Sequence, residues 1–196
     1  MKIFVGGAWD PKRAQHFAQE MRELGRLLAQ RGHDIIFGPG SGVVRYTSEG
    51  FRSIKKRRGK IIFYLPRNKE MIRTGEELEP FADEVIKTED SYLVRVLRMT
   101  EVADGFAAIT GAAGTLYEMI AMMFLKKPVT ILQETGGASN AACFLGGLCE
   151  YVKVARTPQE MVDYLEKAKI TTNIPEEGID WYDVAPAKIS KLEDAN

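Results

Sequence analysis

The chain has 196 residues, of which 45% are hydrophobic and 28% are charged, which suits one compact domain with a sizeable core. Lys plus Arg and Asp plus Glu balance at 27 each, so no net charge draws the chain to nucleic acid or to an anionic membrane. The longest apolar runs are far shorter than a membrane span, and the segment MKIFVGGAWD is too short for a signal peptide. We therefore expect a cytoplasmic protein that has neither nucleic acid nor membrane as a partner.

Short apolar runs alternate with segments of helical periodicity along most of the chain. Strands are expected over residues 2–7, 34–38, 60–66, 83–88, 105–110, 127–133 and 151–155. Helices are expected over residues 10–32, 46–59, 89–103 and 157–168, and between each pair of the last three strands. Residues 67–82 are polar and mixed, so we expect a loop there with one helical turn at most.

The ends of two expected helices carry clear signals. Asp10 can cap the first helix, Pro11 suits its first position and Gly32 suits its end. Thr157 and Pro158 have the same roles at the start of the last helix. These signals support the helix boundaries.

Strands that alternate with helices, and that are apolar almost throughout, predict a parallel sheet covered on both faces. We expect an α/β protein with a doubly wound, mostly parallel sheet of about seven strands, similar to a Rossmann fold. The expected domain covers residues 1–170. Residues 171–196 lose periodicity and gain proline and charge, so we expect a tail that either packs on the surface or is disordered.

The cysteines and histidines give no sign of a metal site. Cys143 and Cys149 lie six residues apart in an expected helix, where they would not face each other, so we expect reduced, buried thiols. His16 and His33 are isolated, and neither has the spacing of a metal ligand.

Two glycine-rich loops follow expected strands, at the sheet edge where such folds bind ligands. They are FGPGSGVV, with Gly38, Gly40, Ser41 and Gly42, and ITGAAGTLYE, with Gly111, Ala112, Gly114 and Thr115. Bare backbone before a helix N-terminus is typical of a phosphate site, and the two hydroxyls add donors. Tight turns also use glycine for steric reasons alone, and neither loop is a Walker A or a GxGxxG motif in good register.

Three charged residues near the second loop are candidates for the chemistry. Glu118 lies one helical turn into the helix, although Thr115-Leu116-Tyr117-Glu118 also fits a capping box. Arg95 and Arg98 lie on the preceding helix, where flanking Leu and Val residues predict extensive burial, although most helical arginines lie on the surface. The basic run at 55–60 is expected to be a solvated face at a helix end rather than a nucleic-acid site.

ITGAAGTLYE resembles the PGGxGTxxE motif of the LOG family, the cytokinin riboside 5′-monophosphate phosphoribohydrolases, within the SLOG superfamily. Asp104-Gly105-Phe106 resembles the family's strand start, and Arg95, nine positions before Asp104, matches the family's arginine. The first glycine-rich loop and KKPVTIL also resemble family segments, so the likeness covers residues 1–168. The chain departs from the motif at Thr110, which stands for its proline, at Ala112, which stands for its second glycine, and at Val96, which stands for the lysine after the arginine.

The resemblance implies hydrolysis of the N-glycosidic bond of a nucleoside 5′-monophosphate to a free base and ribose 5-phosphate. Glu118 and Arg95 would be catalytic, the glycine-rich loops would bind the phosphate, and Arg98 and Thr110 are further candidate contacts. The resemblance also implies a homodimer at least, and no cofactor. The older lysine decarboxylase name of the family finds no support, because neither loop contains a lysine for a pyridoxal phosphate Schiff base. The alternative is a non-catalytic carrier of a nucleotide or a phosphorylated cofactor.

Overall fold

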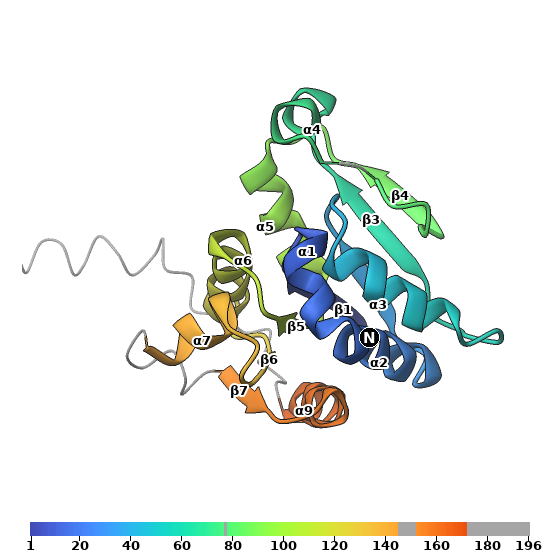
Figure 1. Ribbon diagram of the computed structural model, residues 1–196, viewed down its shortest axis with the longest axis vertical. Helices are drawn as coiled ribbons and strands as arrows, with labels where there is room; N and C mark the ends of the chain where they lie inside the picture. The colour runs from blue at the N-terminus through green and yellow to red at the C-terminus, as the bar shows by residue number, and fades with distance from the viewer. Residues whose placement is uncertain (77, 145–151, 172–196) are drawn as a thin grey trace, which may run out of the picture.

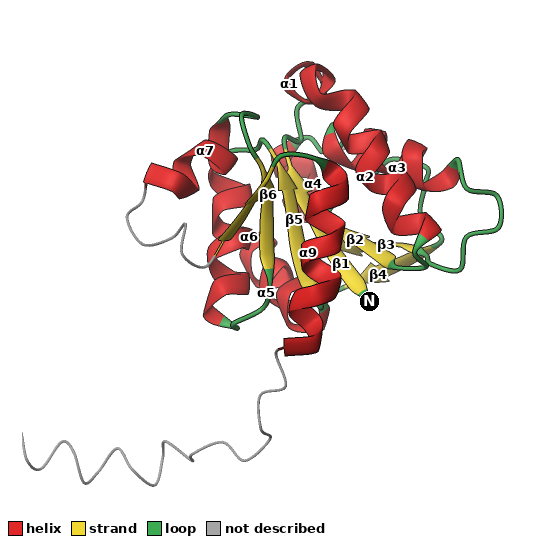
Figure 2. Ribbon diagram, turned by 90° about the horizontal axis from the view of Figure 1, so that it is seen from below, coloured by secondary structure: helices red, strands yellow, loops and turns green. Residues whose placement is uncertain are grey.

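The computed structural model describes residues 1–76, 78–144 and 152–171. In these ranges the chain forms one parallel sheet with helices on both faces (Figure 1, Figure 2). The strands are β1 (Lys2–Gly7), β2 (Asp34–Phe37), β3 (Ile61–Leu65), β4 (Glu84–Lys87), β5 (Gly105–Ile109), β6 (Val129–Leu132) and β7 (Val152–Ala155). The expected doubly wound α/β fold is confirmed.

The strand order is β4-β3-β2-β1-β5-β6-β7, so the sheet grows outward from β1 in both directions. The chain first builds β2, β3 and β4 on one side of β1, and then returns to place β5 on the other side. Phe4 of β1 pairs with Phe106 of β5 at this junction. In such a sheet the carboxyl ends of the strands at the reversal of order leave a crevice for ligands.

Side chains of successive strand residues point to opposite faces, which divides the core in two. Ile3 and Val5 of β1 pack with α2 (Ala18–Gln30), α3 (Val43–Arg52) and α9 (Pro158–Thr171) on one face. Phe4 packs on the other face, which carries α5 (Tyr92–Val102), α6 (Ala113–Phe124) and α7 (Gly137–Phe144). Figure 2 shows these helical layers on either side of the sheet.

The first expected helix is divided, although its start is as expected. The Asp10 carboxylate accepts a hydrogen bond from the Lys12 backbone N–H (2.9 Å), and Pro11 opens a short helix, α1 (Pro11–Ala14). A 3₁₀ turn, η1 (Gln15–Phe17), then leads into α2. The last helix also begins as expected, because the Thr157 hydroxyl accepts a hydrogen bond from the Glu160 N–H (3.1 Å), and it continues to Thr171.

The expectations for residues 46–59 and 67–82 were wrong in part. Helix α3 begins directly after Gly42 and ends at Arg52, so the basic run at 55–60 lies in solvated turns beyond it. The segment expected to be a loop contains a helix, α4 (Asn68–Thr74), which ends at Gly75 in the left-handed conformation (φ 67°). The prediction of buried thiols at Cys143 and Cys149 concerns side chains that the structure does not describe. The expected tail, from residue 172 onward, also lies outside the described residues.

Helix α5 is buried on one side only, which corrects the expectation of extensive burial. Arg95 and Val96 are buried, whereas Leu93, Val94 and Leu97 are exposed. An α-helix on one face of a sheet turns only part of its circumference toward the core. Leu93, Val94 and Leu97, which suggested burial, therefore lie on the outer surface.

Candidate functional site

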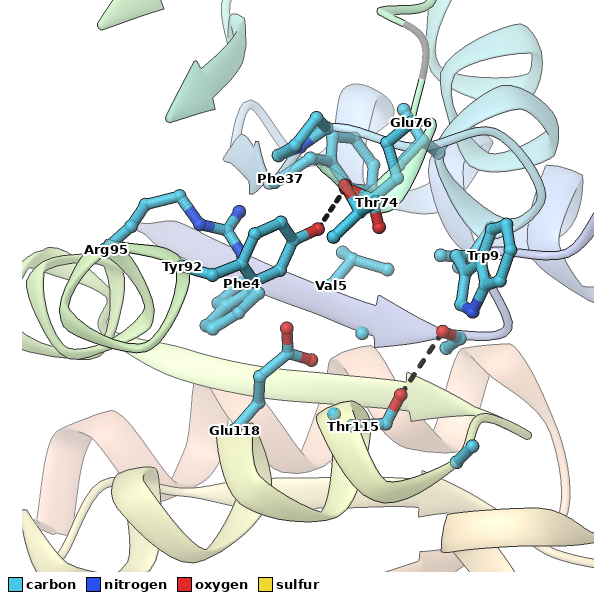
Figure 3. A pocket seen from close by; sticks show the side chains of 18 of the residues that line it. Phe4, Val5, Trp9, Phe37, Thr74, Glu76, Tyr92, Arg95, Thr115 and Glu118 are labelled. Atoms are coloured by element: carbon cyan, nitrogen blue, oxygen red, sulfur yellow. Dashed lines mark hydrogen bonds between the residues drawn. The ribbon is translucent and has the colours of Figure 1, made fainter. Parts of the chain in front are cut away.

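A cavity of about 380 Å³ opens at the carboxyl ends of β1 and β5, at the junction where the strand order reverses. Its walls come from β1 and the turn after it, from the start of the loop after β2, from the end of α4, and from α5 and α6. Figure 3 shows Thr115 and Trp9 toward one end of this cavity, Arg95 and Tyr92 toward the other, and Glu118 between them. A volume of this size falls within the range of small-molecule sites.

The end of the cavity near Trp9 is formed by the start of α6. Ala112 precedes the helix and supplies no side-chain cap, and Ala112, Ala113 and Gly114 are all exposed along the cavity wall. The first N–H groups of a helix have no partner within it, and they carry the positive end of its dipole. An anion at this end of the cavity would meet open backbone donors.

The capping-box interpretation of Glu118 is wrong. The Thr115 hydroxyl donates a hydrogen bond to the Gly7 carbonyl oxygen (3.2 Å), so it fastens α6 to the end of β1. A Cβ atom on Gly111 would lie 2.3 Å from the Thr115 hydroxyl oxygen, and Gly111 has a positive φ of 108°. Gly111 therefore shapes the turn that brings Thr115 against β1, and it lies outside the cavity lining.

Glu118 projects from α6 into the cavity, one turn beyond the open N–H groups (Figure 3). Its carboxyl group lies deep in the fold, above Gly6, where a Cβ atom would come within 2.8 Å of Glu118 Oε2. Burial raises the pKa of Glu118 to about 7, while the positive charge of Arg95 lowers it and the Glu76 carboxylate raises it. A carboxyl group with a pKa near neutrality can exchange protons with a substrate or with water.

Arg95 is the largest fully buried side chain, with 2% of its surface exposed, and it lines the same cavity. Its Nη1 donates a long hydrogen bond to the Tyr64 carbonyl oxygen (3.4 Å), and no described residue accepts a hydrogen bond from its Nε. Its Cζ lies 4.5 Å from the centre of the Tyr92 ring. A buried guanidinium with unused donors is a group that a ligand can satisfy.

Two cavity residues, Tyr92 and Glu76, were missed from the sequence. The Tyr92 hydroxyl donates a short hydrogen bond to Glu76 Oε2. Burial raises the pKa of Glu76 above its usual value, although the Tyr92 hydrogen bond and the Arg95 charge lower it. Tyr92 lies three residues before Arg95, on the same side of α5, and that spacing could have identified it. Glu76 follows α4 in a segment without a recognisable pattern.

The first glycine-rich loop contributes to the site through Gly38, which lies in the cavity wall against Arg95. Gly40, Ser41 and Gly42 do not line the cavity. The Ser41 hydroxyl donates to the Glu79 carboxylate, and a Cβ atom on Gly42 would lie 2.1 Å from the Ala8 carbonyl oxygen. These three residues support the turn into α3, and the structure adds nothing to their predicted contact with phosphate.

The two further candidates also lie outside the cavity lining. Arg98 is exposed on α5 and pairs with Asp90 on the surface. Thr110 is buried with a positive φ of 57°. Its N–H donates to the Thr135 hydroxyl (2.9 Å), and its carbonyl oxygen accepts from the Ser139 hydroxyl (3.4 Å). Thr110 therefore shapes the loop before α6.

Within residues 1–76, 78–144 and 152–171, no group of three or more His, Cys, Asp or Glu side chains is arranged to hold a metal ion. His33 pairs with Glu166 (2.7 Å) at the opposite edge of the sheet, and His16 is exposed. Over the same part of the chain, no helix has both the length and the apolar character that crossing a membrane requires.

A family model described as the SLOG cluster4 family matches residues 1–162. The chain belongs to the SLOG cluster4 family. An uncharacterised protein of Archaeoglobus fulgidus is 26% identical to this SLOG cluster4 protein over 141 residues, which cover 72% of this chain and 80% of that protein.

Two solved structures share the fold of the SLOG cluster4 protein. The protein named TM1055 aligns with a TM-score of 0.72 at 26% identity, over 85% of this chain and 98% of its own. The molybdenum cofactor binding protein of Rippkaea orientalis aligns with a TM-score of 0.67 at 20% identity, over 85% of this chain and 94% of its own. The second likeness is one of fold alone.

Proposed function

We propose that the cavity binds a nucleoside 5′-monophosphate and that the protein hydrolyses its N-glycosidic bond, giving a free base and ribose 5-phosphate. The phosphate lies at the start of α6, the ribose beside Glu118, and the base toward Arg95. The observation that carries this proposal is the position of Glu118 in the cavity, between open helix N–H groups and a buried arginine. Burial raises the pKa of its carboxyl group to about 7, which suits this role. The resemblance of ITGAAGTLYE and Arg95 to the LOG family supports the same assignment.

The phosphate would bind at the start of α6. Ala112, Ala113 and Gly114 present little side chain, and a Cβ atom on Gly114 would have no neighbour within 4 Å. Open N–H groups and the helix dipole stabilise a phosphate there. Binding energy from the phosphate, which is remote from the bond that breaks, can position the sugar next to Glu118.

The chemical step needs stabilisation of a positively charged sugar and activation of water. As the bond between C1′ and the base nitrogen breaks, its electron pair leaves with the base, and the sugar becomes similar to an oxocarbenium ion. The Glu118 carboxylate stabilises that charge and accepts a proton from the water whose oxygen bonds to C1′. The departing base takes up one proton from solvent while Arg95 donates hydrogen bonds to it, and Glu118 returns the proton of the attacking water to solvent. The reaction therefore consumes one water molecule and restores the carboxylate.

The test is release of base. The protein is incubated separately with AMP, GMP, CMP, UMP, IMP and their deoxy forms, and the products are separated by chromatography. The proposal expects a free base and an equal amount of the sugar phosphate from at least one nucleotide. No release from any of them, together with thermal stabilisation by one, would replace hydrolysis with binding alone.

That second function, a non-catalytic carrier of a nucleotide or a phosphorylated cofactor, rests on a specific observation. The Rippkaea orientalis protein with the same fold is named for binding molybdenum cofactor. The departures from the LOG motif at Thr110, Ala112 and Val96 fit this alternative as well. In a carrier, Glu118 and Arg95 would hold the ligand without breaking a bond.

We also propose that the protein is a homodimer at least, with α5 and α6 at the contact between copies. These two helices pack against each other on one face of the sheet. The exposed apolar side chains on these helices, or directly after them, are Leu93, Val94, Leu97, Val102, Phe124 and Leu125. Exposed apolar residues that gather on one surface are typical of a protein contact.

A further inference from the structure

The charges in the cavity are unusual for a site that takes a phosphorylated ligand. Among the described residues that line it, the acidic ones are Glu76 and Glu118 and the basic one is Arg95. Ionised carboxylates only accept hydrogen bonds. In their ionised state, the two acids therefore favour a ligand that donates hydrogen bonds to them.

Glu76 and Glu118 lie on different walls of the cavity. Glu118 comes from α6 next to the phosphate end, whereas Glu76 follows α4 and is joined to Tyr92 on α5. Figure 3 shows the Tyr92–Glu76 hydrogen bond across the cavity from Glu118. A ribose placed beside Glu118 would direct its base away from the α6 N-terminus, toward Glu76, Tyr92 and Arg95.

Glu76 is held in place with most of its acceptor capacity unused. A carboxylate can accept about four hydrogen bonds. Tyr92 supplies one, and no second donor to Glu76 is found in the described ranges. The Tyr92 ring is itself fixed against the Arg95 guanidinium. An oriented, partly buried acceptor that lacks donors is satisfied by a ligand N–H group.

We propose that Glu76, oriented by Tyr92, selects a nucleobase that carries an exocyclic amino group. This inference rests on the proposed nucleotide site and names the substrate class within it. An amino group donates a hydrogen bond to the carboxylate. A carbonyl oxygen at the same position would only accept, so its lone pairs would repel those of the carboxylate oxygen. Rejection of a ligand that leaves a buried polar group unpaired is strong, because the unpaired group keeps its desolvation cost.

AMP and IMP, and likewise CMP and UMP, differ in an amino group against a carbonyl oxygen. Their dissociation constants are measured by titration calorimetry on the full-length protein and on Glu76→Gln and Tyr92→Phe. Where base release is detected, all forms carry Glu118→Gln to prevent turnover. Glu70→Gln is the matched control, because Glu70 lies on α4, pairs with Arg73 and is outside the cavity lining.

We expect the amino member of at least one pair to bind tenfold or more tightly than the carbonyl member. Glu76→Gln should bring that ratio to within about twofold, since an amide can both donate and accept, and Glu70→Gln should leave it unchanged. Tyr92→Phe keeps the ring but frees Glu76, so the ratio should fall to an intermediate value. Ribose 5-phosphate should bind all variants equally.

Equal binding of both members of each pair to the parent protein would overturn the inference, and so would a ratio that survives Glu76→Gln. Ribose 5-phosphate separates this failure from failure of the site itself. If the sugar phosphate binds and the base preference is absent, only the role of Glu76 is wrong. If neither the sugar phosphate nor any nucleotide binds, the proposed function is wrong and the inference falls with it.

Discussion

Nη1 of Arg95 occupies the space in which a side chain on Gly38 would begin, since a Cβ atom there would lie 1.7 Å from it. The glycine after β2 therefore makes room for the guanidinium that α5 buries in the cavity. The backbone conformation of Gly38 is one that alanine can adopt, so the close approach alone accounts for the need for glycine.

Gly38→Ala should displace the Arg95 guanidinium. The end of an arginine side chain is flexible, so we expect the free energy of unfolding to fall by only about 1 kcal/mol. The affinity for nucleoside monophosphates should fall at least tenfold, because the displaced group no longer faces the ligand. Denaturant unfolding and titration calorimetry measure the two effects. Unchanged affinity in a folded variant would show that the position of Arg95 does not matter for binding.

Arg95 and Arg98 allow a matched comparison on one helix. Arg95→Met removes a buried charge from the cavity, whereas Arg98→Met removes an exposed charge paired with Asp90. We expect base release to fall a hundredfold or more in the first variant and to stay within twofold in the second. Initial rates at saturating nucleotide give the comparison. Equal losses in both variants would point to damage of α5 rather than to a role in the site.

Glu118 makes the stability of the ligand-free protein depend on pH. Burial raises its pKa from an ordinary 4.5 to about 7, so the folded protein holds this proton more tightly than the unfolded chain does. That contribution is complete below about pH 4.5, and it is lost as the pH rises through about 7. Relative to the parent protein, Glu118→Gln should therefore gain a few kcal/mol, on the order of 2–3, between about pH 5 and about pH 8. Denaturant unfolding at both pH values measures this difference, and a constant difference would mean that the carboxyl group titrates normally.

The proposed contact between copies is tested by placing charge on its apolar surface. Phe124 is 83% exposed and Leu93 is 62% exposed, so substituting either should cost the single chain little stability. Leu93→Glu and Phe124→Glu should each lower the molar mass measured by light scattering on a sizing column to that of one chain. Ile72→Glu is the control, because Ile72 is 82% exposed and lies on α4, outside the two helices of the proposed contact. A parent protein that is already monomeric would contradict the proposal.

The sheet was predictable because its strands are short apolar runs with clear ends. From the sequence alone, the apolar run before Gly111 and the helical pattern after it predicted that Glu118 lies at the edge of the sheet. Helix α4 was missed because its seven residues are too few to show an apolar period. Glu76, which follows this helix, was therefore not identified as a site residue. Leu93 and Leu97 on α5 misled for a different reason, since an exposed apolar residue has the same chemistry as one in the core.

Contacts between segments that are far apart in the sequence could not be predicted either. The Thr115 hydroxyl could have capped its own helix, and only the fold shows that it binds the Gly7 carbonyl instead. Likewise, Gly38 at the end of β2 lies against Arg95 of α5, and no local sequence pattern predicts this contact. Site residues that lie within one sequence motif were therefore predictable. Site residues that depend on contact between two separate segments were not.

In the proposed reaction, Glu118 carries out the chemistry and the rest of the cavity holds the nucleotide. The most direct measurement compares the parent protein with Glu118→Gln on the nucleotide that releases the most base. The dissociation constant of the variant is measured by calorimetry, the Michaelis constant of the parent from initial rates, and base release from both by chromatography. We expect the dissociation constant of the variant to lie within a few-fold of the parent's Michaelis constant, and the variant to release no detectable base. Base release by the variant at the parent's rate would contradict this expectation.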